Sequence, residues 1–156
     1  MGYTLTSRDF QALAELRHQL RLFLRFSETA ARSTGLEPRQ HQLLLALKGL
    51  PRNKPPQIKE LAERLQIRHH SAVELTNRLA AGGYVVRKRS QQDRRAVLLA
   101  LTPKGERVLH KLSLHHQAEL RARGPALAAA LGQIMQAAAP ARRNGSHGRN
   151  STSKPQ

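Results

Sequence analysis

Apolar side chains recur every three or four residues near the start of the chain, the spacing that gathers them on one face of an α-helix. This stripe consists of Phe10, Leu13, Leu16, Leu20, Phe23 and Leu24. Thr6 or Ser7 can cap the helix, and Asp9 then lies in the first turn, where a negative charge is favourable. The pattern predicts a long helix over residues 7–35 that ends at Gly35. Periodicity does not decide whether its apolar face packs on the same chain or on another subunit.

Shorter apolar patterns in the next part of the chain predict a helix-turn-helix. Pro38 suits the first turn of a helix, which a proline-rich loop follows. A short helix is then expected from Ile58 to Leu65 and another from His69 to Ala81, with a tight turn between them. The pair Gly82-Gly83 can cap the second of these helices. Two short helices joined by a tight turn define a helix-turn-helix.

The apolar period then changes from that of a helix to that of a strand. Residues 84–89 and 96–101 are predicted to form a hairpin, with the polar run 90–95 as its loop. Thr102 and Pro103 follow as a hydroxyl cap and a proline at the first position of another helix. The sequence therefore predicts a mainly α fold with one small β-hairpin, in the α+β class.

The C-terminal part is predicted to contain two helices and a tail. We expect Gly124-Pro125 to end the helix that begins at Pro103, because a proline inside a helix removes one hydrogen bond and clashes with the preceding turn. A last apolar helix should then extend to about residue 139. No apolar residue follows Ala141, so residues 140–156 are expected to form a disordered basic tail.

Length and charge narrow the class of partner. The chain has 156 residues, enough for one domain with a single core. Its 27 Lys and Arg residues against 10 Asp and Glu residues give a formal net charge of +17, which favours a polyanion. No apolar run reaches the roughly 18–20 residues that span a bilayer, and the N-terminal residues lack the pattern of a secretory signal. No membrane partner is expected, and the expected location is cytoplasmic.

The absence of cysteine and the small number of aromatic residues narrow the class of partner further. The chain has no cysteine, which excludes disulfides, thiolate metal sites and cysteine-based redox sensing. Its 3 Phe and 2 Tyr residues are scattered, whereas proteins that bind single-stranded nucleic acid usually offer several aromatic stacking platforms. Double-stranded DNA is therefore the expected partner.

The second helix of the predicted motif has a polar face opposite Ala72, Leu75 and Leu79. A recognition helix enters the major groove and presents its first turns to the base edges. Asn77 can pair bidentately with adenine, and Glu74 can accept a hydrogen bond from cytosine. We therefore predict DNA contacts from Arg68, His69, His70, Ser71, Glu74, Asn77 and Arg78. The alternative is that these side chains form an ordinary solvated helix face.

The predicted hairpin carries basic residues within nine positions, opposed by one acidic residue: Arg87, Lys88, Arg89, Arg94 and Arg95 against Asp93. Folding does not require such self-repulsion. A phosphate backbone or a narrow minor groove, whose negative potential attracts arginine, does explain it. The hairpin is therefore predicted to be a DNA-binding wing, and the alternative is a charged hairpin that only aids solubility.

The run SAVELTNRLAAGGYVVRKRSQQDRRAVLLALTPKGERVL resembles the MarR family of winged helix-turn-helix regulators, most closely in DRRAVLLALTPKG. The resemblance implies that Arg95 enters the minor groove and that Asp93 orients it by a salt bridge. It also implies a homodimer built from the first helix and the last two helices. Where the family often has a serine cap before the recognition helix, this chain has Arg68, so the register of the outward face could differ by one residue.

The resemblance gives a domain map and a mode of control. Residues 1–139 would form a single domain, with 7–35 and 103–139 as dimerisation helices and 38–101 as the winged helix-turn-helix lobe. Family members are commonly released from DNA by a small aromatic or phenolic ligand that binds between these parts. Polar side chains that could line such a pocket, or could be ordinary surface residues, are Arg17, His18, Arg21 and His41.

The sequence also bears on three other functions. A metal-responsive regulator could use Glu106, His110, His115 and His116 together with His41, although histidines without a recognised ligand spacing are usually surface residues. An architectural protein would bind all duplexes by charge alone and lose affinity steeply in salt. The sequence shows no phosphate-cradling glycine motif, nucleophile with a base or paired carboxylates, so neither an enzyme nor a bound cofactor is expected. The favoured function is a sequence-specific repressor relieved by a ligand.

Overall fold

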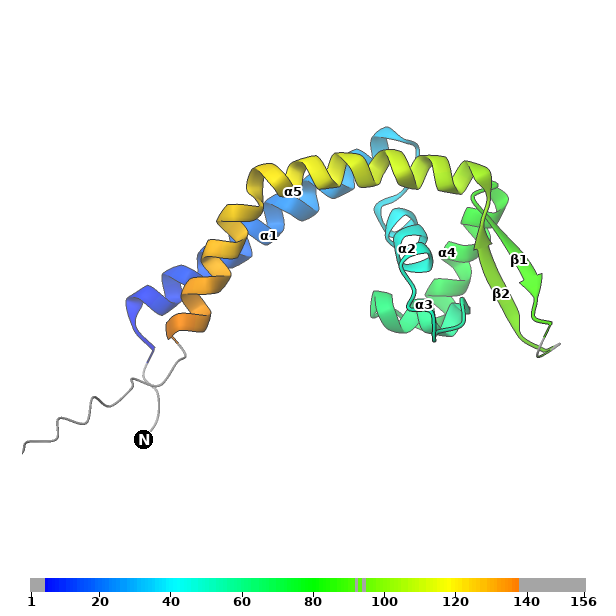
Figure 1. The fold of residues 1–156 in the computed structure, drawn as a ribbon, viewed down its shortest axis with the longest axis horizontal. Coiled ribbons are helices and arrows are strands. Elements are labelled where there is room, and N and C mark those ends of the chain that lie inside the picture. The colour runs from blue at the N-terminus through cyan, green and yellow to red at the C-terminus, as the bar shows by residue number, and fades with distance from the viewer. Residues whose placement is uncertain (1–4, 92, 94, 138–156) are drawn as a thin grey trace, which may run out of the picture.

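A computed structural model describes residues 5–91, 93 and 95–137 and shows a helical arm joined to a smaller lobe (Figure 1). The elements are α1 (Ser7–Ser33), α2 (Pro38–Lys48), α3 (Ile58–Leu65), α4 (His69–Ala81), β1 (Val85–Arg89), β2 (Val97–Leu101) and α5 (Pro103–Ala137). Helices α1 and α5 lie side by side in the arm, and α2, α3, α4 and the hairpin form the lobe. The predicted α+β fold with one hairpin is confirmed. The tail predicted at 140–156 lies outside the described residues.

The helix boundaries follow from local capping. Thr6 and Asp9 form a capping box, in which the Thr6 backbone N–H donates to the Asp9 carboxylate at 2.7 Å. Pro38 occupies the first turn of α2, as predicted. Gly35 adopts a φ of +80°, which L side chains disfavour, and turns the chain out of α1. The predicted starts and ends of α3 and α4 match the structure.

The predicted break at Gly124-Pro125 is wrong, because α5 continues through it to Ala137. Proline costs the helix one backbone hydrogen bond and strains the preceding turn, and such sites commonly bend a helix without ending it. Figure 1 shows α5 curving as it runs along α1. Helix α5 packs along α1, a tertiary contact that can offset the lost hydrogen bond and that a local pattern does not reveal.

The core lies inside the lobe and under the start of α5. Every element of the lobe contributes a side chain that is at most 3% exposed, and α5 contributes Leu109 and Leu112. The lobe members include Leu43, Leu44, Leu61, Leu79, Val85 and Leu99. Burial of these side chains fixes the hairpin and the helix-turn-helix relative to one another.

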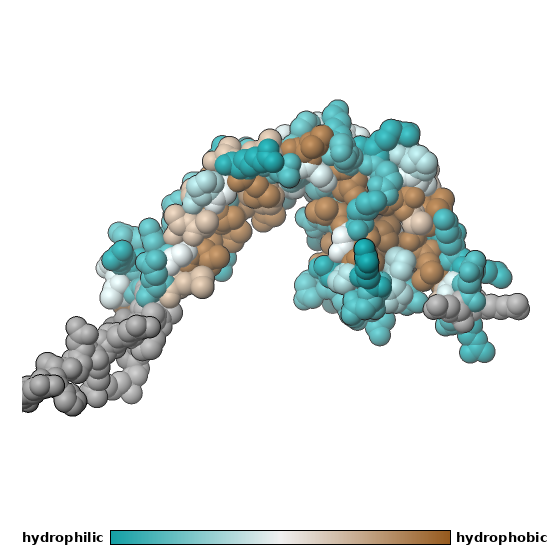
Figure 2. Space-filling model, in the orientation of Figure 1, coloured by the Kyte–Doolittle hydropathy of each residue, from teal (hydrophilic) through white to brown (hydrophobic). Residues whose placement is uncertain are grey.

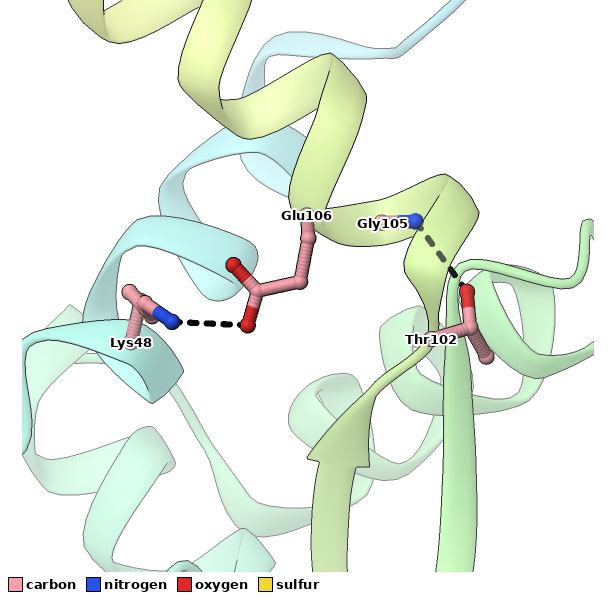
Figure 3. Close-up of polar contacts among 4 residues, drawn as sticks. All are labelled: Lys48, Thr102, Gly105 and Glu106. Carbon is pink, nitrogen blue, oxygen red and sulfur yellow. Dashed lines mark hydrogen bonds and ion pairs between the residues drawn. The ribbon is translucent and has the colours of Figure 1, made fainter.

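The junction between the hairpin and α5 is tightly built (Figure 3). The Gly105 backbone N–H donates to the Thr102 hydroxyl at 3.1 Å, the predicted hydroxyl cap. A Cβ at Gly105 would overlap the carbonyl oxygen of Tyr84, so glycine is required there. The next residue, Glu106, forms an ion pair with Lys48 of α2 at 2.7 Å. These contacts attach the arm to the lobe. Over the ranges described, no helix has the length and apolar character needed to cross a bilayer.

Candidate nucleic-acid interface

The turn between α3 and α4 sets the angle of the predicted recognition helix. Gln66 ends α3 in the left-handed region with a φ of 53°, and the Ile67 N–H returns to the Ala62 carbonyl at 3.0 Å. Arg68 is the N-cap of α4 and makes no side-chain capping bond. The helix nevertheless begins at His69, so the one-residue displacement considered for the outward face does not occur.

Helix α4 separates its apolar and polar residues onto two faces. Ala72, Leu75, Thr76 and Leu79 are buried against the lobe. Ser71 is half-buried, and the other predicted contact residues on the opposite face are exposed: Arg68, His69, His70, Glu74, Asn77 and Arg78. The structure thus brings the predicted recognition residues together on one accessible surface.

The strand register divides the basic residues of the hairpin between two faces. Arg87 pairs with Leu99 and Arg89 pairs with Val97, whereas Lys88 pairs with Leu98. Because successive side chains of a strand alternate, Arg87 and Arg89 share the face of the buried Val85 and Leu99, and Lys88 lies on the other. The Arg87 guanidinium reaches α4 and donates a hydrogen bond to the Asn77 side-chain oxygen at 2.5 Å.

At the hairpin tip, Asp93 has a contact different from the one implied by family resemblance. Its carboxylate accepts a hydrogen bond from the Arg95 backbone N–H at 2.9 Å, and its own N–H donates to the Ser90 hydroxyl at 3.2 Å. Asp93 therefore orders the turn through the backbone. Both Asp93 and Arg95 are exposed, and Arg94 lies outside the described residues. A salt bridge between the two side chains stays a prediction.

The cationic side chains that the structure describes on α4 and the hairpin form no ion pair. In the described ranges, ion pairs involve Arg32, Lys48, Lys54 and Arg123, and none comes from α4 or the hairpin. Guanidinium groups that are not neutralised by a carboxylate attract a polyanion and release its counterions on binding.

Sequence reasoning missed two features of the lobe. The Leu99 N–H donates to the Pro56 carbonyl at 2.8 Å, so the proline-rich loop covers the outer edge of β2. A polar pocket of about 440 Å³ lies beside the recognition helix, lined by Glu28, Arg32, Glu37, Pro38, Arg39, Gln42, Leu75 and Arg78. The proline run marked the loop, but neither feature has a local sequence signal because each joins distant segments.

The four residues predicted to line a ligand pocket are not brought together. Arg17, His18 and Arg21 are exposed on α1, whereas His41 is 3% exposed in the lobe. A cavity of about 480 Å³ between α1 and α5 is lined instead by Phe26, Thr29, Ala30, Ser33, His115, Ala118 and Glu119. None of the predicted four lines this cavity.

His41 stacks on His116 where the lobe meets the arm, with ring centroids 4.8 Å apart. Contacts at 2.6 Å to the Leu112 carbonyl and at 2.7 Å to the Ser27 hydroxyl fix the His116 ring, because a carbonyl only accepts and Nδ1 must therefore donate. The His41 Nδ1 is buried without a hydrogen-bond partner in the described structure. Burial, with a smaller electrostatic contribution from the neighbouring His116, lowers the pKa of His41 to about 4.

The residues that a metal-responsive regulator could use as ligands are engaged in other contacts or are exposed. Glu106 is paired with Lys48, His110 and His115 are exposed, and His116 contacts Ser27. Across the described ranges, no group of three or more His, Asp or Glu side chains is placed to hold a metal ion.

This fold and its basic surface define a winged helix-turn-helix protein. Comparison with known proteins identifies the family: the MarR family model matches residues 34–96, which cover the lobe from the start of α2 to the hairpin. The chain is 30% identical to the transcriptional repressor CouR in a structure bound to a 23-mer DNA duplex, over 76% of this chain and 87% of that one, with a TM-score of 0.58. The chain therefore belongs to the MarR family, whose members compared here are transcription regulators and not enzymes.

Two further solved structures share the fold. AbsC, a MarR family transcriptional regulator from Streptomyces coelicolor, is 21% identical over 78% of this chain and 82% of its own, with a TM-score of 0.64. CouR from Rhodococcus jostii RHA1, bound to p-coumaroyl-CoA, is 24% identical over 67% of this chain and 72% of its own, with a TM-score of 0.59. Among curated protein sequences, none matches this chain.

Proposed function

We propose that this protein is a homodimeric, sequence-specific repressor that binds duplex DNA through α4 and the hairpin and is released by a small molecule. The observation that carries the proposal is that the exposed recognition residues of α4 and the exposed arginines of the hairpin lie on adjacent elements, which the Asn77–Arg87 hydrogen bond joins. Helix α4 would enter the major groove and the hairpin the adjacent minor groove, where Arg95 would insert. A repressor of this kind acts on the chromosome, so a cytoplasmic location belongs to the proposal.

The exposed apolar surface of the arm supports the dimer in this proposal. Exposed apolar side chains follow α1 at Phe10, Leu13, Leu20 and Leu24, and follow α5 at Leu114, Leu120, Leu131 and Met135. Figure 2 shows brown, apolar surface extending along the arm beyond the lobe. Apolar surface of this extent is characteristic of a protein interface. A two-fold dimer through the arm would present two recognition helices about one DNA turn apart, roughly 34–36 Å.

The cavity between α1 and α5 is the proposed effector site. Phe26, Ala30 and Ala118 supply apolar lining, and His115 and Glu119 supply polar groups at its margin. This lining suits a small aromatic or phenolic molecule, and the p-coumaroyl-CoA complex of CouR supports control by a small molecule. Phe26 also contacts the His116 ring, which stacks on His41 of α2, so this path could transmit occupancy to the lobe.

Selection from random duplex DNA at about 0.15 M salt tests the function. We expect a pseudo-palindromic motif whose half-sites are centred about ten base pairs apart, bound roughly 10³-fold or more tightly than unrelated duplex. Strong binding at low salt with no enriched motif would contradict the proposal and support a charge-driven architectural protein.

A further inference from the structure

The contact between Asn77 and Arg87 joins the recognition helix to the wing. Asn77 is the ninth residue of α4 and lies on its exposed face with His70 and Glu74. Arg87 lies on the face of β1 that is directed toward the lobe, and its Nη2 donates to the Asn77 Oδ1 at 2.5 Å. Both side chains are exposed, so the pair stands at the surface between the two DNA-binding elements.

This bond determines which chemical groups the pair can bind. Arg87 occupies one of the two lone pairs of the Asn77 oxygen, which leaves the other lone pair and the two N–H donors of the amide. Arg87 has only donors. Bidentate pairing with adenine needs an amide that both donates and accepts, so the same oxygen would have to accept from adenine and from Arg87 at once. The pair therefore presents mostly donors, which suit a group that only accepts, such as a phosphate.

The position of the pair on the lobe indicates the same ligand. When a helix occupies the major groove and a wing the adjacent minor groove, the sugar-phosphate strand between the grooves passes between helix and wing. Asn77 and Arg87 bridge that gap, and Arg89 continues the basic face two residues further along β1. Glu74, one turn before Asn77 on α4, is the nearby acidic residue and is expected to face the base edges.

We propose that Asn77 and Arg87 form one phosphate-binding unit that holds the DNA strand separating the two grooves. Asn77 is then a backbone contact, in place of the adenine contact that its residue type suggests. This inference rests on the proposed function. It predicts that the pair contributes equally to binding of any duplex sequence and does not contribute to specificity.

The decisive variant is Asn77→Asp. An aspartate has the same shape and still accepts from Arg87, but it replaces both N–H donors with a carboxylate oxygen that repels phosphate. We expect its Kd to rise about tenfold on both the selected duplex and an unrelated duplex, so that their ratio is unchanged. Gln117→Glu, an exposed change of the same charge on α5, is the matched control and should alter Kd by less than about twofold.

A second variant keeps the test informative if Asn77→Asp lowers the melting temperature. Arg87→Gln keeps a donor toward Asn77 but removes the positive charge, so both duplexes should bind more weakly. The slope of log K against log salt should fall by about 0.9. Binding of Asn77→Asp at the level of the Gln117→Glu control, or a loss on the selected duplex alone, overturns the proposal. If the unsubstituted chain binds no duplex, the proposed function itself is wrong.

Discussion

The lobe and the arm of this protein are stabilised in different ways. In the lobe, side chains such as Leu43, Leu44 and Leu79 are fully buried within one chain, and most exposed residues are polar or charged, with Leu45, Val86 and Val97 as exceptions. In the arm, α1 and α5 contact each other but leave large residues such as Phe10 and Met135 exposed, at 59% and 66%. The difference indicates that the lobe is complete as a single chain, whereas the arm requires a second copy to bury its apolar faces.

Two matched Leu→Ala substitutions, one in the lobe and one in the arm, test this difference, and the substitution in the lobe should have the largest effect on stability. Leu44 is fully buried, so Leu44→Ala should lower the free energy of unfolding by about 2–5 kcal/mol, through lost burial and a cavity. Leu24 is 49% exposed, so Leu24→Ala should change stability mainly by weakening the dimer. Thermal unfolding at several protein concentrations measures both. Leu24→Ala should make the melting temperature depend more strongly on protein concentration. Identical behaviour of the two variants would contradict the proposed difference between lobe and arm.

The pH dependence of stability tests the contact between His41 of the lobe and His116 of the arm. The pKa of His41 is lowered to about 4 by burial and, to a smaller extent, by the neighbouring His116, whereas an unfolded histidine titrates near 6.5. The unfolded chain therefore takes up a proton first, and stability should fall as the pH decreases from 6.5 to 4, by about 3 kcal/mol. Urea unfolding across this range gives the measurement. The control, His41→Phe, keeps a ring against His116 but cannot titrate, and a curve parallel to that of the unsubstituted protein would refute the assignment.

A substitution at the wing tests the lobe without affecting the arm. Arg95 is exposed and has no ionic partner in the described structure, so Arg95→Ala should leave folding and dimerisation intact. If the side chain enters the minor groove, DNA binding should weaken by about 1–3 kcal/mol. Fluorescence anisotropy with the selected duplex measures this, and Arg121→Ala, a change at an exposed arginine of α5, provides the matched control. Equal affinities for the two variants would exclude Arg95 from the interface.

The smallest expected effect lies in the turn of the helix-turn-helix. Gln66 has a φ of 53°, a conformation that glycine adopts without strain. Gln66→Gly should therefore raise the free energy of unfolding by up to about 1 kcal/mol, reduced by the greater flexibility of glycine in the unfolded chain. Gln57→Gly, at an extended position, is the control and should not stabilise the protein. A lower melting temperature for Gln66→Gly would show that its side-chain bond to the Glu63 carbonyl outweighs the strain.

Where a structural feature depends on neighbouring residues, the sequence predicted it well. The bounds of α4 followed from its apolar period and from Gly82-Gly83, and Gly83 indeed adopts a φ of +73°. The start of α5 followed from Thr102-Pro103, although only the structure explains Gly105, whose missing Cβ makes room for the Tyr84 carbonyl. Helix caps and turns depend on residues that are consecutive in the sequence, so they can be recognised before the fold is known.

Features that join distant segments could not be predicted in the same way. The continuation of α5 through Pro125 depends on packing along α1. The His41–His116 stack and the Asn77–Arg87 bond depend on the angles between elements, which periodicity does not specify. The candidate contact residues were recognised by type and position, but the atoms that Asn77 has available for DNA became clear only from its partner.

The central claim is that the lobe binds DNA and the arm binds a second copy of the chain. Native mass spectrometry of the protein with its selected duplex tests both parts at once. We expect two chains on one duplex, and Leu24→Glu should yield one chain per half-site with much weaker binding. A single unsubstituted chain on the complete site, or a number of bound chains that simply grows with duplex length, would contradict the account.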